Sequence, residues 1–232
     1  MSYSINHISP SLDIGSFKPS RITVIEGSSG MIPGVLFHLC AASIISLGRD
    51  AMFVDGCNSF NPYTVSKIVR SSGAHPKKVL SRIHVARAFT EYQMDALIDG
   101  LREAIDNWTP AVLAVSYLPS LFSGADGRRL LGPLLERLKA LTSSSDIITA
   151  ITSFGGSWYG DRLLAGYASR IVRIEHPSKK IIRIIDNGLV TEYMPVPAGQ
   201  MRFSDFMVST DPSYFTGGDA YGQDCPQLSQ PA

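Results

Sequence analysis

The segment at residues 24–40, VIEGSSGMIPGVLFHLC, contains the residue types of a phosphate-binding loop. An apolar run leads into a turn of glycine and serine, and an apolar segment with helical potential follows. Loops of the pattern G-x-x-x-x-G-K-[ST] hold phosphates with backbone N–H groups, while their Lys and Ser/Thr serve the outer phosphates and magnesium. Gly27 matches the first glycine of this pattern. Ile32, Pro33 and Gly34 stand where Gly, Lys and Ser or Thr belong, so the phosphate chemistry is incomplete.

Two interpretations of this loop are open. Its backbone N–H groups would bind an anion at the N-terminus of the following helix. Alternatively, the loop is a tight turn between strand and helix, with Pro33 in the first helical turn, where proline is tolerated. The sequence favours the turn. If the chain binds a nucleotide, the candidate residues in this loop are Gly27, Ser28, Ser29, Gly30 and Gly34, and Asp55 and Ser116 complete the set.

Asp55 follows the apolar run AMFV, at the end of an expected strand. Ligands of α/β proteins bind at this end of parallel strands, so Asp55 is a candidate site acid. The alternative is a structural cap, in which the carboxylate accepts hydrogen bonds from the N–H groups of Asn58 or Ser59. Cys57 lies in the same loop, and no His or Lys adjoins it in the sequence. We therefore expect Cys57 to be buried or inert rather than reactive.

Composition limits the classes of protein to which the chain can belong. It has 232 residues, of which 44% are apolar and 18% charged, which suits one globular domain with a substantial core. A formal net charge of +1 gives no general argument for nucleic-acid binding. No run of about 18 apolar residues predicts a membrane span. The three cysteines form no zinc-binding pattern, so we expect a reduced, cytoplasmic protein without a metal site.

Apolar runs alternate with amphipathic segments along residues 21–153. Continuous apolar strands that alternate with helices are typical of a parallel sheet with helices on both faces. We therefore predict an α/β fold with a mostly parallel central sheet. The expected strands are 21–26, 51–54, 83–87, 111–116 and 146–153, and the expected helices are 35–47, 63–71, 90–107 and 126–142.

The pattern changes after this region. Segments 168–175 and 180–186 alternate apolar and charged residues, which predicts C-terminal antiparallel strands joined by a turn at 176–179. Asn187 and Gly188 predict a second turn, followed by a last short strand.

Pro, Gly, Ser, Asp and Gln dominate from residue 195 onwards, which indicates a flexible tail. Residues 201–208 (MRFSDFMV) are the one stretch of this tail that suggests a short docked element. The chain thus divides into an N-terminal segment at 1–20, a core domain at 21–194 and a C-terminal tail at 195–232.

Three segments resemble the ATPase core of the RecA/RadA recombinase superfamily, and in particular its small archaeal RadB-type paralogs. MFVDGCNSFNPYTVSKIV is similar to the family's strand and loop, Y-I-D-T-E-G-T-F-R-P-E-R-I. SRIHVARAFTEYQMDALI is similar to N-I-x-x-A-R-A-Y-x-x-x-x-Q and is the most specific match. PAVLAVSYLPSLF is similar to the Walker B strand, L-x-x-V-D-S-x-x-x-x-F. The resemblance covers the region from about residue 20 to residue 190 and implies a RecA-like fold.

The resemblance also implies which parts of the hydrolysis machinery are substituted. Pro33 stands in the Gly-Lys-Thr position of the first loop and offers neither an ammonium group nor an N–H. Cys57 matches the acid that activates water, and a thiol is the poorer base. Ser116 matches the Walker B aspartate and lacks the anionic oxygen that magnesium favours. We therefore expect no ordinary Mg-ATP hydrolysis and no bound cofactor.

A divergent ATPase is the alternative to this expectation. In it, Asp55 binds magnesium, and Lys67 or an arginine from a neighbouring subunit replaces the missing lysine.

The family binds single-stranded DNA through loops after its fourth and fifth strands, which match residues 123–129 (SGADGRR) and 154–162 (FGGSWYGDR). Both segments contain glycine and arginine, and the second adds aromatic rings that can stack on bases. The same rings would equally suit a protein partner. The candidate DNA-binding residues are Arg128, Arg129, Phe154, Trp158, Tyr159 and Arg162.

A retained scaffold with three substituted catalytic positions points to a non-catalytic RecA/RadB-like paralog. We expect it to act in DNA recombination or repair, by assembling with itself or with an active RecA/RadA-like protein. A DNA-binding module that needs no nucleotide is a further hypothesis. A structural subunit of an unrelated complex is another, because a fold does not fix a function.

Overall fold

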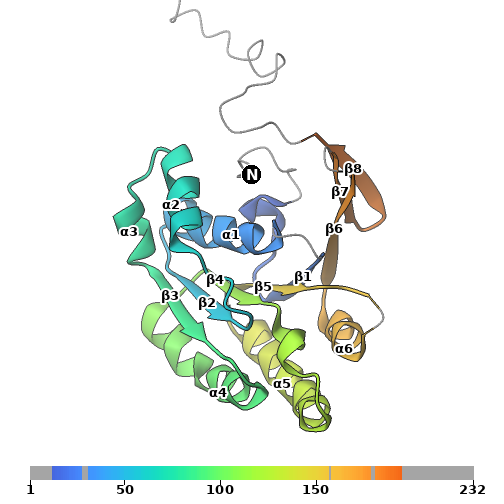
Figure 1. The fold of residues 1–232 in the computed structure, drawn as a ribbon. Coiled ribbons are helices and arrows are strands. Elements are labelled where there is room, and N and C mark those ends of the chain that lie inside the picture. Colours follow the sequence, from blue (N-terminus) through green and yellow to red (C-terminus); the bar gives the residue numbers. More distant parts are fainter. Residues whose placement is uncertain (1–11, 28–30, 157, 179–180, 195–232) are drawn as a thin grey trace, which may run out of the picture.

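The computed structural model describes residues 12–27, 31–156, 158–178 and 181–194. They form an α/β fold around an eight-stranded sheet with the order β3-β2-β4-β5-β1-β6-β7-β8 (Figure 1). The first six strands in this order run parallel, and β7 and β8 add as antiparallel strands. The predicted fold class is thus confirmed. The strands are β1 (Arg21–Glu26), β2 (Ala51–Asp55), β3 (Ile83–Arg87), β4 (Val112–Ser116), β5 (Ile148–Ser153), β6 (Arg170–Ser178), β7 (Ile181–Asp186) and β8 (Leu189–Tyr193).

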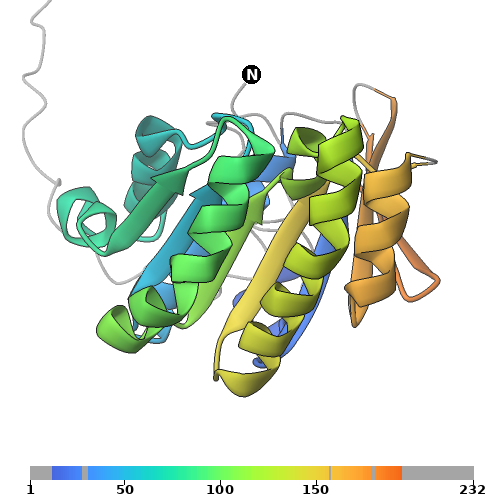
Figure 2. The same ribbon diagram turned by 90° about the horizontal axis from the view of Figure 1, so that it is seen from below.

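Helices cover both faces of the sheet. The helices α1 to α3 lie on one face, and α4 to α6 lie on the other, as the view from below shows (Figure 2). No helix among the described residues is both long and apolar enough to cross a bilayer. The helices are α1 (Ile32–Ser46), α2 (Pro62–Ser71), α3 (Pro76–Leu80), α4 (Glu91–Trp108), α5 (Ala125–Ser144) and α6 (Tyr159–Tyr167), with short 3-10 turns at η3 (Ile14–Ser16) and η4 (Leu118–Leu121).

The side chains of each strand alternate between two apolar layers, one on each face. In β1, Ile25 packs in the layer under α1, whereas Val24 packs in the layer under α4 and α5. Both layers are buried, so the strands read as continuous apolar runs, and this is why the sequence pattern identified them. The leucines of α5 recur at helical spacing and fill the second layer.

The N-terminal segment contributes to the core, which its sequence did not predict. Leu12, Ile14 and Phe17 are buried in the apolar layer shared with α1. The guanidinium of Arg170 lies 5.2 Å from the centre of the Phe17 ring and holds this segment against β6. The described part of the segment at 1–20 therefore packs on the domain.

Several local predictions differ from the structure. The turn expected at 176–179 is wrong, because β6 continues to Ser178 with an irregular register after Glu175. The turn at Asn187 and Gly188 is confirmed, and both residues have positive φ angles of 49° and 80°. Helices α3 and α6 were not expected. The tail at 195–232, with its segment 201–208, lies outside the described residues.

The connections of β2 and β4 diverge at the carboxyl edge of the parallel strands. The chain leaves β2 into α2 on one face and leaves the neighbouring β4 into α5 on the other face. In α/β proteins, ligands usually bind beyond the carboxyl ends of adjacent strands whose connections diverge in this way. Asp55 and Ser116 are the last residues of these two strands.

Candidate functional site at the carboxyl edge of the sheet

Asp55 and Ser116 lie side by side, since the register of β2 and β4 pairs them directly. The Ser116 hydroxyl donates a hydrogen bond to Asp55 Oδ1 over 2.7 Å. Both residues are fully buried. The structure therefore brings Asp55, the candidate site acid, into direct contact with Ser116, for which the sequence resemblance suggests the Walker B position.

The loop after β2 supplies further donors to Asp55. The N–H of Ser59 donates to Oδ1 and the N–H of Phe60 donates to Oδ2, each over 2.9 Å. The Ser59 hydroxyl adds a bond of 3.1 Å to Oδ1, and Arg87 Nε lies 3.3 Å from Oδ2. The expected cap is thus confirmed at Ser59, while Phe60 takes the place considered for Asn58.

Two opposing effects set the pKa of Asp55. Burial raises it, because a charged carboxylate loses solvation. The hydrogen bonds from the Phe60 and Ser59 N–H groups and from the Ser116 and Ser59 hydroxyls lower it, and together they prevail. The pKa of Asp55 therefore lies below its usual range, and the group is an ionised cap with both oxygens engaged.

Cys57 is exposed, so of the two expected alternatives, a buried or an inert thiol, the structure excludes the first. Its Sγ lies 4.0 Å from the Ser116 hydroxyl. Loss of solvation raises the pKa of the thiol, the neighbouring charge of Asp55 raises it further, and contacts with Ser59 and Ser116 oppose this only in part. A raised pKa leaves little thiolate at neutral pH, which agrees with an inert thiol.

Gly27, the first residue after β1, packs tightly between β5 and β6. The Gly27 N–H donates to the Ser153 carbonyl over 3.0 Å, and a Cβ on Gly27 would lie 2.6 Å from the Ile174 carbonyl oxygen. Pro33 and Gly34 belong to the first turn of α1, as the turn interpretation requires. Ser28, Ser29 and Gly30 lie outside the described residues, so contacts of this loop with an anion stay a prediction.

A second polar cluster lies beside Gly27. Arg173 donates to Glu26 Oε2 from Nε and Nη2 over 3.1 and 3.0 Å. The Ser153 hydroxyl donates to Asp161 Oδ1 over 2.5 Å and accepts from the Gly155 N–H over 3.0 Å. Burial raises the pKa of Asp161, and the charge of Glu26 adds to this effect although the Ser153 bond opposes it.

The Glu26–Arg173 pair opens onto a cavity of about 540 Å³. Phe154, Gly155 and Gly156 form its wall after β5, and β6 contributes Glu175 and His176. Sequence reasoning missed Glu26 and Asp161 as site residues. The available signal was their acidic character at a strand end and at a helix start, but neither position belongs to a recognisable motif.

The structure corrects the two expected DNA-binding loops. Arg128 and Arg129 lie in the first turns of α5, and Tyr159 and Arg162 lie in α6, so these four residues are helical. The irregular connections are therefore shorter than predicted. Trp158 directly precedes α6, and its ring leaves no room for a Cβ on Gly160.

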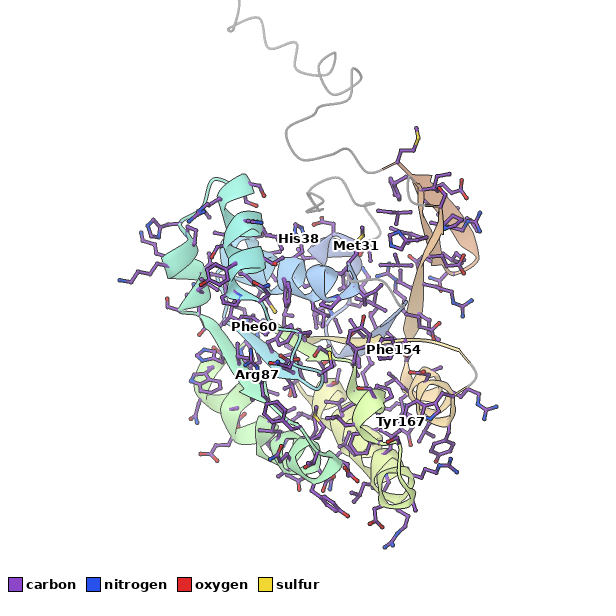
Figure 3. All side chains as sticks on the ribbon, viewed as in Figure 1. Met31, His38, Phe60, Arg87, Phe154 and Tyr167 are labelled. Atoms are coloured by element: carbon purple, nitrogen blue, oxygen red, sulfur yellow. The ribbon has the colours of Figure 1, made fainter. Side chains whose placement is uncertain are left out.

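The starts of α5 and α6 nevertheless meet. The Arg128 guanidinium lies 5.9 Å from the centre of the Tyr159 ring. Phe154 is exposed and stacks on Tyr117, with ring centres 4.2 Å apart. Figure 3 shows Phe154, Arg87, Phe60 and Met31 arranged around the same edge of the sheet. Of the predicted DNA-binding residues, Phe154 lies nearest in contact to the Asp55–Ser116 pair, because Tyr117, on which it stacks, directly follows Ser116.

No model of a known protein family matches the chain. Within the described ranges, no group of three or more His, Cys, Asp or Glu side chains is placed to hold a metal ion. The carboxyl edge combines a buried, fully hydrogen-bonded carboxylate at Asp55 with the exposed ring of Phe154, which stacks on the buried Tyr117. Both oxygens of Asp55 are engaged by donors from the protein itself.

Proposed function

We propose that the chain is a non-catalytic RecA/RadB-like paralog that acts in DNA recombination or repair as an assembly or mediator subunit. The observation that carries the proposal is the hydrogen bond from Ser116 to Asp55. In this proposal Ser116 stands at the Walker B position, and its hydroxyl helps to hold Asp55 as an ionised cap, so neither residue is disposed to bind magnesium. In this proposal the RecA-like fold is retained, while Asp55 and Ser116 stabilise that fold instead of binding magnesium.

The same contact weighs against the divergent ATPase. For Asp55 to bind magnesium, it would have to give up donors from Ser59, Phe60 and Ser116. Each such bond to a buried charge contributes about 1.5–3 kcal/mol, and the loop after β2 would lose its anchor. Ion binding would need to offset this loss without the lysine that normally balances phosphate charge.

The open edges of the sheet support a role in assembly. Among the described residues, β3 and β8 each have a strand neighbour on one side. Val85, Phe89 and Tyr92 expose apolar surface on and just after β3. An edge strand with exposed apolar side chains is a template for pairing with another chain.

Sedimentation velocity of the purified chain, alone and with a recombinase whose G-K-T loop is intact, tests the proposal. We expect either self-association or a mixed complex at micromolar concentration, and we expect Phe89→Ser to weaken it. Leu189→Ser is the matched control, because Leu189 is 70% exposed but lies on β8, at the opposite edge of the sheet from β3. A chain that stays monomeric in both samples contradicts the proposal.

Calorimetry with Mg-ATP and Mg-ADP separates the two nucleotide hypotheses. The non-catalytic paralog gives no magnesium-dependent heat at millimolar nucleotide. Tight, magnesium-dependent binding that Asp55→Asn abolishes supports the divergent ATPase instead.

Contact with single-stranded DNA is a second candidate function, and the Arg128–Tyr159 and Phe154–Tyr117 contacts favour it. An exposed ring next to arginines can stack on a base while the cations meet phosphates. We expect salt-sensitive binding to an oligonucleotide, weakened by Phe154→Ala and by Arg129→Ala. Arg70→Ala, on the exposed surface of α2, is the control. Binding that both site variants leave unchanged rejects this surface.

A further inference from the structure

A second cavity, of about 550 Å³, lies at the opposite edge of the sheet from the site above. Its wall comes from the N-terminal segment, from the starts of β1 and β6, and from the turn between β7 and β8. Arg21, Arg170 and Asp186 face the same side of the sheet as Ile25, Val172 and Ile184, which pack under α1. Lys18 reaches the cavity from the segment that precedes β1.

One part of the wall is fixed and nearly neutral. Arg170 donates to both oxygens of Asp186, from Nε over 3.1 Å and from Nη2 over 2.7 Å. Its Nη1 also donates to the Ser16 carbonyl over 3.2 Å. Both partners of the ion pair are largely buried, with side-chain exposures of 15% and 17%. Asp186 is therefore already paired with Arg170, and its negative charge does not neutralise the other cations that line the cavity.

The remaining charges are positive. Within the described residues, neither Lys18 nor Arg21 has an ion pair, although both line the cavity. Asn187 adds a side-chain amide whose N–H groups can donate to an anion. Two unpaired cations that share a cavity repel one another, and an anion between them would remove that repulsion.

We propose that this cavity binds a small phosphorylated molecule through Lys18 and Arg21. The planar guanidinium of Arg21 offers paired N–H donors that match two phosphate oxygens, and the lysine adds a point charge. The cavity is larger than one phosphate group and lies in the size range of small-molecule sites, so the ligand carries an organic part or a second phosphate. The site is separate from the carboxyl edge and does not depend on the function proposed there.

Titration of the full chain with pyrophosphate tests the proposal, by calorimetry and by thermal unfolding. We expect saturable binding that raises the unfolding temperature and weakens as salt increases. The double variant Lys18→Gln/Arg21→Gln should lose at least tenfold in affinity. Both side chains are exposed and carry no ion pair in the described part of the chain, so the variant is expected to fold normally.

The control is Lys67→Gln/Arg70→Gln, which removes the same two residue types at the same spacing from the exposed side of α2. It should bind pyrophosphate within twofold of the parent chain. Citrate is the second arm, because it carries a similar charge on carboxylates. No binding at millimolar pyrophosphate, equal loss in both double variants, or tighter binding of citrate would each overturn the proposal.

Discussion

The hydroxyl of Ser116 donates to Asp55 Oδ1 over 2.7 Å and ties the carboxyl ends of β4 and β2 together. The backbone repeats this link, since the Gly56 N–H donates to the Ser116 carbonyl over 3.1 Å. A Cβ on Gly56 would lie 2.7 Å from that carbonyl oxygen. Only glycine therefore lets the backbone after β2 pass so close to the end of β4. At the edge where α/β proteins usually bind ligands, the ends of β2 and β4 are therefore packed directly against each other.

Removal of the Ser116 hydroxyl should destabilise the fold. Ser116→Ala leaves a buried carboxylate with one donor fewer, which costs about 2 kcal/mol of unfolding free energy. Denaturant unfolding measures the change. Ser66→Ala is the control, because the Ser66 hydroxyl bonds only its own helix, at the Pro62 carbonyl, and lies near the surface. An equal, small effect of both variants would show that the Ser116 bond contributes little.

Stability should fall in acid, and Asp55 should account for part of the loss. Its folded pKa lies below the unfolded value of about 3.9, so the unfolded state binds the proton first as pH decreases. The stabilisation is complete above that value and is lost as pH falls below it. Asp55→Asn should unfold more easily at pH 7 but show a flatter decline between pH 5 and pH 3, measured by urea unfolding. A decline as steep as that of the parent chain would assign the acid sensitivity to other groups.

The central strands and the long helices were predictable from the sequence because the spacing of their apolar residues reflects their burial. Strands such as β2 and β4 are buried on both faces, so their apolar runs are continuous. Helices α4 and α5 have apolar residues at helical spacing, and Thr90 caps α4 by accepting from the Gln93 N–H. These signals are local and need no knowledge of the tertiary structure.

The missed elements lack such a signal. Helix α3 has five residues, too few for a helical period to show. Helix α6 contains Gly160 and Gly166 and follows two further glycines, so its sequence reads as a loop. Its formation rests on tertiary contacts, with Leu164 buried in the layer shared with α5.

The site could be predicted only in part, for a related reason. Asp55 was identified from its place at a strand end, and a cap was one of the two roles that the sequence left open for it. Its contact with Ser116 depends on β2 lying next to β4, and these strands are separated in the chain by β3 and α4. The pairing of Ser153 with Asp161 likewise requires the turn into α6, which the sequence did not indicate.

Neutralisation of Asp161 should stabilise the protein near pH 7. Burial and the charge of Glu26 hold the folded pKa of Asp161 above its unfolded value, so its ionisation opposes folding as pH rises. Asp161→Asn keeps an acceptor for the Ser153 hydroxyl and should raise the unfolding free energy by on the order of 1 kcal/mol, the scale of a relieved repulsion between two nearby carboxylates. The gain should shrink as pH falls towards 4.

Asp126→Asn provides the contrast to this variant, because Asp126 also lies in the first turn of a helix, but is exposed. An exposed acid at a helix start is favourable, so this change should lower stability by a few tenths of a kcal/mol. If both substitutions shift stability in the same direction, the effect comes from the position of the acid at a helix start. It does not then come from the burial of Asp161 and its repulsion by Glu26.

Two glycines of α5 should respond oppositely to alanine. A Cβ on Gly127 would lie 2.7 Å from the backbone of Phe122, whereas a Cβ on Gly132 would meet nothing within 4 Å. Gly132→Ala should therefore stabilise the helix by about 1 kcal/mol, through its better helix propensity. Gly127→Ala should cost roughly 1–3 kcal/mol, since the clash is with backbone and cannot be relieved by a side-chain rotation. Urea unfolding of both variants measures this difference, and a stabilising Gly127→Ala would show that the start of α5 is not held against η4 as closely as the structure has it.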